Sequence, residues 1–251
     1  MNEQKMFHVP AGAGDAGEYC ILPGDPGRCE RIAACFDDFA FAGQNREFTL
    51  FSGHLDGKKV SVCSTGIGGP SAAIAMEELF LCGVRTFIRV GTCGGIAERV
   101  KSGDCIVASA AVRQDGTSRE YAPVEFPAAA DFAVVSALAE AAKVKKYVHH
   151  VGVVQSKDSF YGQHDPGRMP VASDLAEKWE AWKRLGVLGS EMECATLFTV
   201  AAALGARCGG VMHVVWNQER KLKGLYEEDA HDAGRAIVLA VDAVRLLIHN
   251  E

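Results

Sequence analysis

Short apolar runs rich in β-branched residues alternate along the chain with segments whose apolar residues recur at helical spacing. The runs predict buried strands, and the spaced segments predict helices packed on a sheet. We expect strands at residues 19–22, 60–64, 86–90, 104–112, 150–155 and 210–216, and a hairpin over 51–62. Helices are expected over 29–36 and 128–144, before residues 81, 185 and 204, and at the C-terminus. This alternation predicts one α/β domain over residues 1–251, with a twisted, mixed central β-sheet flanked by helices.

Residues 86–96, TFIRVGTCGGI, form the most informative stretch. An apolar run ends there in an expected glycine-rich turn, where backbone N–H groups can face a ligand without an intervening Cβ. Arg89 interrupts the run, and a buried arginine is costly unless it is paired or faces a polar site. With the hydroxyl of Thr92 nearby, Arg89 indicates an anion site at the carboxyl end of a strand. The alternative is a tight turn whose arginine pairs with a structural carboxylate.

Two further glycine-rich segments follow expected strands. Residues 23–28, PGDPGR, form a rigid turn that ends in Arg28, a plausible phosphate ligand at a helix start. Residues 65–71, TGIGGPS, lie between a strand and a helix. They match neither the dinucleotide-binding glycine pattern nor a P-loop, which disfavours a Rossmann dehydrogenase.

Two polar segments carry further candidate chemistry. Residues 156–169 are expected to form a mobile loop that joins aromatic, amide, imidazole and guanidinium groups, a combination suited to a heterocyclic base. Glu191 and Glu193 straddle a methionine just before an expected buried helix. Such carboxylates are unusual in a core, although acids at a helix N-terminus also favour the helix dipole.

Composition narrows the functional class. The chain has 251 residues, a formal charge of −6 and no apolar run long enough for a membrane span. We therefore expect no nucleic-acid or membrane partner. The polar residues 1–8 predict no secretory signal, and nine cysteines without a Cys-x-x-Cys pair indicate buried thiols in a reducing cytoplasm. The eight histidines show no metal-ligand spacing.

Taken together, the ordered motifs resemble those of the nucleoside phosphorylase family over nearly the whole chain. The motifs that carry the resemblance are GDPGR at 24–28, REF at 46–48, STGIGGPS at 64–71, RVGT at 89–92 and EME at 191–193. The resemblance implies a pentosyltransferase that converts a nucleoside and phosphate into a free base and ribose 1-phosphate. The purine branch carries an aspartate just after the last strand, whereas residues 215–218 read VWNQ. That absence, together with Phe160 and Gln163, favours a pyrimidine base, so uridine is the expected substrate.

The resemblance also implies a role for individual residues. Phosphate is expected to contact Gly24, Arg28, Arg46, Arg89 and Thr92. Ribose is expected to contact His8, Glu191, Met192 and Glu193, and the base to contact Phe160, Gln163 and Arg168. The chemistry itself would depend on Arg89, Thr92, Glu193 and Gln163. In this scheme Gln163 donates to and accepts from the uracil edge.

One departure from the family pattern affects base recognition. The family usually places an arginine two residues after the loop glutamine, where this chain has Asp165. Either Arg168 reaches the base or His164 replaces the missing arginine, and Arg168 is favoured. The alternative to both is that Arg168 faces solvent and that Gln163 and the backbone hold the base. The preference between uridine and deoxyuridine or thymidine stays open. A purine or methylthioadenosine phosphorylase or nucleosidase is the alternative enzyme, and a non-catalytic nucleoside-binding subunit is the alternative class.

No organic cofactor is expected, because phosphate is the co-substrate and carries its own negative charge. Glu47, Ile67 and Ser71 resemble positions where relatives hold a monovalent cation such as K+, a ligand set of oxygens that suits a hard ion. The resemblance further implies a dimer-based homo-oligomer, a hexamer, in which the neighbouring subunit supplies His8 and Arg46 to each site.

Overall fold

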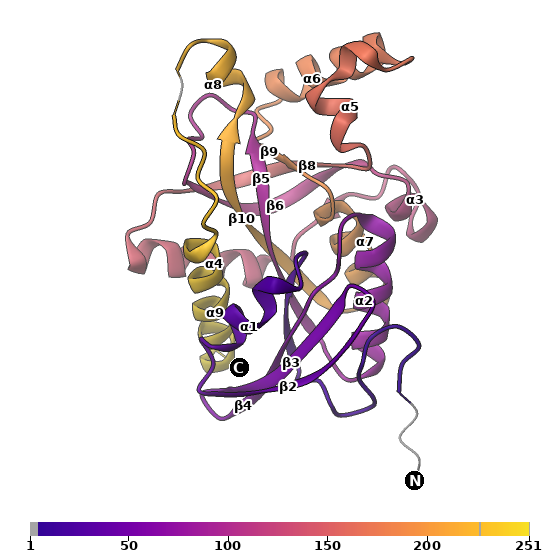
Figure 1. Cartoon of the computed structure of the whole chain (residues 1–251), viewed down its shortest axis with the longest axis vertical. Helices are drawn as coiled ribbons and strands as arrows, with labels where there is room; N and C mark the ends of the chain where they lie inside the picture. The colour runs from indigo at the N-terminus through magenta and orange to yellow at the C-terminus, as the bar shows by residue number, and fades with distance from the viewer. Residues whose placement is uncertain (1–4, 226, 251) are drawn as a thin grey trace.

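The computed structural model describes residues 5–225 and 227–250 (Figure 1). Residues 1–4, part of the segment expected to lack a secretory signal, lie outside the described residues. The strands are β1 (Tyr19–Pro23), β2 (Asp38–Asn45), β3 (Phe48–Leu55), β4 (Lys58–Cys63), β5 (Thr86–Gly95), β6 (Cys105–Gln114), β7 (Ala128–Ala129), β8 (His149–Lys157), β9 (Gly189–Glu191) and β10 (Arg207–Asn217).

The helices of the described residues cover both faces of the sheet. They are α1 (Gly27–Ala33), α2 (Gly69–Leu81), α3 (Thr117–Tyr121), α4 (Phe132–Lys145), α5 (Phe160–His164), α6 (Ala172–Arg184), α7 (Cys194–Leu204), α8 (Gln218–Leu222) and α9 (Gly234–His249), with a short 3-10 turn, η1, at Pro166–Arg168. Figure 1 shows α4 and α9 on one side of the central strands and α2 and α7 on the other. None of these helices has both the length and the apolar character needed to cross a bilayer.

The sheet is mixed, and part of it closes on itself. Its strand order is β10-β6-β8-β9-β5-β1-β4-β3-β2, and β10 also pairs with β5, so five strands form a closed ring. The expected mixed sheet flanked by helices is therefore confirmed, and the closure is an additional feature. Ring closure places the ends of β5, β8, β9 and β10 close together at one edge of the molecule.

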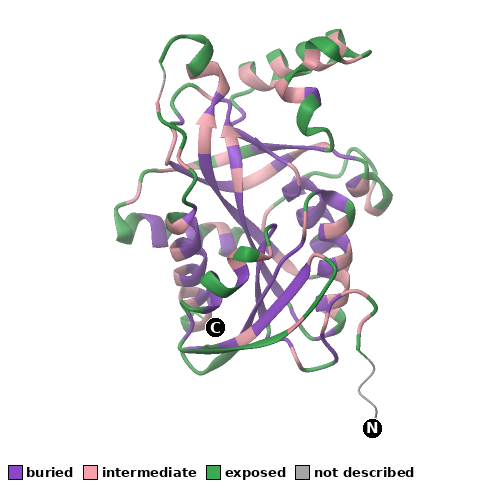
Figure 2. Cartoon of the chain, in the orientation of Figure 1, coloured by how far each residue is buried: buried purple, intermediate pink, exposed green. Residues whose placement is uncertain are grey.

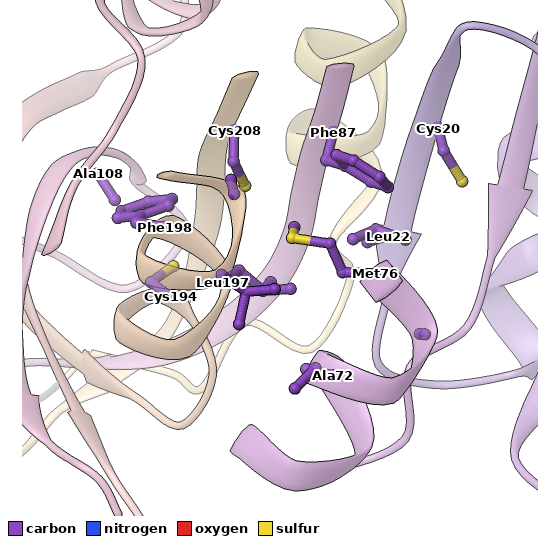
Figure 3. Close-up of a cluster of buried hydrophobic side chains, with 14 of the residues drawn as sticks. Cys20, Leu22, Ala72, Met76, Phe87, Ala108, Cys194, Leu197, Phe198 and Cys208 are labelled. Atoms are coloured by element: carbon purple, nitrogen blue, oxygen red, sulfur yellow. The ribbon is translucent and has the colours of Figure 1, made fainter. Parts of the chain in front are cut away.

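Two apolar cores fix the helices against the sheet. One core joins α2 and α7 to the strands through residues such as Leu22, Met76, Phe87 and Phe198 (Figure 3). The other joins α1, α4 and α9 to the opposite face. Because β5 contributes to both cores, its apolar run is continuous rather than alternating. Figure 2 shows the central strands as buried, whereas α6 is exposed or half-exposed along its length.

In the middle of strand β5, one side of the strand is not paired with another strand of the described residues. On one side β10 pairs with it as far as Gly95. On the other side β1 pairs as far as Val90, and β9 joins only at Gly94. Between these two positions no strand of the described residues covers that side of β5. The backbone around Thr92 therefore faces a cavity instead of another strand.

Three local predictions were wrong. Gly94 and Gly95 do not form a turn: β5 continues through them, and a Cβ on Gly95 would lie 2.7 Å from Asn217 Nδ2, so glycine permits close strand packing there. The segment 156–169 is not a plain loop, because it contains the end of β8, then α5 and η1. The helix expected from residue 128 begins at Phe132, where the Asp131 side chain accepts a hydrogen bond from Val134 N and caps it.

Candidate active site

A cavity of about 800 Å³ opens at the uncovered stretch of β5. Its walls come from β5, the β1–α1 turn, the β4–α2 loop, α5 and the β9–α7 junction. Most residues predicted from the sequence to form the site line it. They are Gly24, Arg28, Glu47, Ile67, Ser71, Arg89, Thr92, Phe160, Glu191, Met192 and Glu193. A space of this size holds a nucleoside together with an inorganic anion.

Arg89 is the buried cation of this cavity. Its side chain is 5% exposed, and Nη2 lies 2.7 Å from Glu193 Oε2. Nη1 donates to Thr65 Oγ1 at 3.2 Å and to Leu22 O at 3.3 Å. Its Nε is buried without a hydrogen-bond partner in the described part of the chain. Arg89 is thus paired with a carboxylate, as the alternative interpretation expected, but within a continuous strand and not in a tight turn. The anion site stays a prediction.

Arg28 brings a second guanidinium to the same wall. It lies in the first turn of α1, directly after the Pro23–Gly27 turn, and its side chain is 24% exposed. Burial lowers the pKa of Arg28, and the positive charge of Arg89 lowers it further. Asp25 offsets this only weakly at 3.7 Å. Two cations that repel each other in a partly buried cavity form a site that an anion would stabilise.

Gly24 allows an anion to approach this pair. A Cβ at position 24 would lie 3.2 Å from Arg89 Nη2 and 3.3 Å from Nη1. It would also lie 3.0 Å from the carbonyl oxygen of Gly66. The missing side chain therefore leaves the guanidinium of Arg89 open to the cavity.

The two glutamates at the β9–α7 junction have different surroundings. Glu193 accepts from Gly68 N at 2.7 Å through Oε1, while its other oxygen binds Arg89. Glu191 Oε2 accepts from the backbone N–H groups of Glu193 at 2.8 Å and Cys194 at 2.9 Å, and its Oε1 accepts from Ser156. Burial raises the pKa of Glu191, and the nearby Glu193 adds to this effect. Glu191 thus caps α7, and Glu193 is the carboxylate directed at Arg89.

Aromatic rings form one wall of the same cavity. The centroid of the His164 ring lies 4.3 Å from that of Phe160. His164 also stacks on Trp216, with ring centroids 5.3 Å apart. Phe160, His164 and Trp216 all line the cavity. Arg168 does not: its side chain is 57% exposed, pairs with Asp165 at 3.3 Å and lies over the Tyr161 ring. Of the two candidates for the missing arginine, His164 is the one that the fold places at the cavity.

Gln163 lies in an adjoining cavity of about 300 Å³. Its Oε1 accepts from Ser190 Oγ at 2.5 Å. His8 and Arg46 also lie away from the main cavity. His8 Nδ1 is 2.7 Å from Glu78 Oε1, and Arg46 occupies the exposed turn between β2 and β3 with a φ of 52°. Arg46 and Glu47 therefore both belong to the turn that joins β2 to β3.

A model of the phosphorylase superfamily matches residues 18–244. The chain belongs to the phosphorylase superfamily. It is 50% identical over 245 residues to uridine phosphorylase of Treponema pallidum, covering 98% of this chain and 95% of that protein.

Other superfamily members match as completely. Uridine phosphorylase of Escherichia coli is 43% identical over 253 residues, which cover 99% of this chain and 100% of that protein. Guanosine phosphorylase of Halorubrum lacusprofundi is 39% identical over 250 residues, or 97% of this chain and 99% of that protein. The family expected from the motifs is therefore confirmed.

The residues expected to hold a cation, Glu47, Ile67 and Ser71, all line the cavity, and two of them are in contact. Ser71 Oγ donates to Glu47 Oε1 at 2.8 Å and lies 2.5 Å from Thr65 O. Hydrogen bonds from its own backbone N–H and from Ser71 lower the pKa of Glu47, which keeps this carboxylate ionised. Carboxylate and hydroxyl oxygens suit a hard cation, and K+ at Glu47, Ile67 and Ser71 stays a prediction.

Several residues at the cavity were not singled out from the sequence. They are Lys157, Ser190 and Trp216. Lys157 lies in a polar segment, where lysine is ordinarily solvated, and Trp216 lies in an apolar strand, where it resembles a core residue. No local pattern separates them from ordinary positions, because the closed ring of strands brings them together.

Proposed function

We propose that this chain catalyses the reversible phosphorolysis of uridine to uracil and ribose 1-phosphate, as a step of pyrimidine nucleoside salvage. The observation that carries the proposal is the pair of arginines, Arg28 and Arg89, in one cavity with the Glu193 carboxylate. Full-length similarity to proteins named uridine phosphorylase supports the same base. Phosphate is the co-substrate, and no organic cofactor takes part.

The arginines account for phosphate as the nucleophile. Charge-assisted hydrogen bonds from Arg28 and Arg89 hold the anion, with Gly24 N–H and the Thr92 hydroxyl beside them. A phosphate oxygen attacks C1′ of the ribose, the C1′–N1 bond breaks, and its electron pair leaves with the base. Phosphate is itself anionic, so no activated serine or cysteine is needed. Its charge also stabilises the oxocarbenium character that develops at C1′.

The ribose lies between the arginines and the aromatic wall. Glu193 accepts hydrogen bonds from ribose hydroxyls, and its pairing with Arg89 fixes the direction of the carboxylate. Met192 packs against the sugar. Glu191 supports the ribose site indirectly, because its carboxylate already accepts hydrogen bonds from the backbone of Glu193 and Cys194.

The identity of the base has two candidates, a pyrimidine and a purine. Phe160 supplies a stacking surface for a pyrimidine, and residues 215–218 carry no aspartate for a purine nitrogen. Similarity to a guanosine phosphorylase favours a purine as the second candidate. Base release from uridine, thymidine, inosine and guanosine at saturating phosphate decides between them. We expect uridine to give the highest kcat/KM, and a higher value for guanosine would overturn the pyrimidine assignment.

We further propose a homohexamer built from dimers in the cytoplasm, with K+ at Glu47, Ile67 and Ser71. The positions of His8 and Arg46 outside their own cavity support a shared site. Mixing Arg46→Ala chains with Arg89→Met chains under exchange conditions tests this. A shared site restores activity, because some sites then receive both native arginines. A mixture no more active than its components would refute sharing.

A further inference from the structure

Lys157 is a buried cation at the junction of the two cavities. It is the last residue of β8 and is 5% exposed. It lines both the main cavity and the smaller one that contains Gln163. A lysine is almost never buried to this degree unless it is paired with an opposite charge. An unpaired buried lysine is therefore a candidate for a functional role.

Its hydrogen-bond partners in the described residues are neutral. Nζ donates to Ser190 Oγ at 2.7 Å and to the carbonyl oxygen of Glu191 at 3.5 Å. Burial lowers the pKa of Lys157 to about 8, although the charges of Glu191 and Glu193 act in the opposite direction. A cation held in this way lowers the stability of the free protein and is available to an electron-rich ligand.

Ser190 connects Lys157 to the glutamine of the expected base site. Lys157 donates to Ser190 Oγ, which in turn donates to Gln163 Oε1 at 2.5 Å. This direction orients the amide oxygen of Gln163 toward Ser190, so its amide nitrogen points to other acceptors. Lys157 thus offers an N–H donor in the cavity that Phe160, His164 and Trp216 also line, and Ser190 joins it to Gln163 in the adjoining cavity.

We propose that Lys157 is a catalytic residue that donates a hydrogen bond to a carbonyl oxygen of the departing pyrimidine. The inference rests on the proposed function and names the group that activates its leaving base. As the C1′–N1 bond breaks, the electron pair delocalises from N1 onto the carbonyl oxygens of the base. The ammonium of Lys157 stabilises that charge, and N1 then takes its proton from water. Arg168 is tied to Asp165 outside the cavity and does not supply this charge.

The competing role for Lys157 is structural, as a clamp that holds Ser190 and the start of α7. The two roles differ in their dependence on the leaving group. Stabilisation of a developing negative charge matters less when the base is more acidic. A clamp affects every substrate equally.

The experiment compares uridine with 5-fluorouridine, whose base is the more acidic leaving group. Lys157→Met removes the charge and keeps the apolar stem, and Lys178→Met, at an exposed lysine on α6 paired with Asp174, is the matched control. We expect Lys157→Met to lower kcat/KM for uridine by about 100-fold or more, in the range for loss of one hydrogen-bond donor to a developing negative charge. The loss for 5-fluorouridine should be about tenfold smaller, the Tm should be equal or higher, and the control should match the wild type.

Equal losses for the two substrates, or a loss for uridine below about threefold, would overturn the proposal. Should Lys157→Met fail to fold, Lys157→Gln, which can still donate to Ser190, is judged by the same ratio. A wild type that releases no uracil refutes the proposed function and this inference together. An active wild type with equal losses refutes the inference alone.

Discussion

Arg89 and Glu193 form a buried ion pair, with Arg89 Nη2 2.7 Å from Glu193 Oε2 and both side chains at most 6% exposed. The pair joins β5 to the start of α7 across 104 positions of sequence. One member faces the expected anion and the other faces the expected sugar. In the proposed reaction, phosphate and the ribose of the nucleoside are therefore bound by two side chains that orient each other.

Replacing Arg89 should remove both activity and stability. Arg89→Met leaves the Glu193 carboxylate buried without its counter-charge, a change that costs about 3–5 kcal/mol of unfolding free energy. It also removes a guanidinium from the phosphate, so we expect kcat/KM for phosphate to fall by about 100-fold or more. Urea unfolding and steady-state kinetics check both results. Arg184→Met, at an exposed arginine of α6, is the control and should change neither.

Glu193→Gln tests the contact to ribose. A glutamine keeps an oxygen for Gly68 N–H, but it lacks the charge that strengthens a bond to a ribose hydroxyl. We expect kcat/KM to fall more for uridine than for 2′-deoxyuridine, by about tenfold, because the deoxy substrate lacks one of the hydroxyls. Equal losses for the two substrates would show that Glu193 does not bind the 2′-hydroxyl.

Glu191 should act mainly on stability. Its carboxylate caps the N-terminus of α7, and Glu191→Ala leaves the backbone N–H groups of Glu193 and Cys194 without their acceptor. We expect a loss of about 1–3 kcal/mol in unfolding free energy. Glu191→Gln, which retains one oxygen, should lose less. Denaturant titration measures both, and Glu180→Ala on the exposed face of α6 serves as the reference.

His164 and Arg168 make a matched pair for base recognition. His164 stacks on Trp216 at the cavity, whereas Arg168 is paired with Asp165 outside it. We expect His164→Ala to raise KM for uridine by about tenfold, in keeping with the loss of one stacking contact, and Arg168→Ala to leave it within about twofold. The reverse order would mean that the segment from α5 to η1 rearranges when substrate binds.

The titration of Lys157 predicts an alkaline limit on activity. Its charged form is lost as pH rises through its pKa of about 8, so kcat/KM for uridine should decline there. Unfolding does not account for the decline: this pKa lies below the ordinary 10.5, so the unfolded chain binds more protons between the two values and stability rises with pH. Lys157→Arg should move the limit upward, and an unmoved limit would assign it to another group.

Local sequence patterns were sufficient to predict the strands and helices that bury a run or a face of apolar residues. The continuous run at β5 and the regular spacing of α9 follow directly from the sequence. Strand β2 was not predicted, because it is an edge strand whose residues are almost all exposed and carry no alternation. The turn expected at Gly94 was wrong because a glycine that allows strands to approach closely looks the same in sequence as one that bends the chain.

Site residues could be predicted where they belong to a local sequence motif. They could not be predicted where only the strand topology brings them to the cavity. Arg89 and Glu193 could each be singled out, but their pairing depends on how β9 joins β5 and places the β9–α7 junction beside it. Lys157 was missed because burial alone distinguishes it from a solvated loop lysine. The closure of β10 onto β5, which no periodicity encodes, brings Trp216 to the same cavity.

The most direct test of phosphorolysis is the identity of the sugar product. Uridine is incubated with the full-length protein, with and without inorganic phosphate, and uracil and ribose 1-phosphate are quantified by chromatography and phosphorus NMR. Phosphorolysis through Arg28 and Arg89 predicts one ribose 1-phosphate per uracil and no release without phosphate. Release of uracil with free ribose, at a rate independent of phosphate, would contradict it.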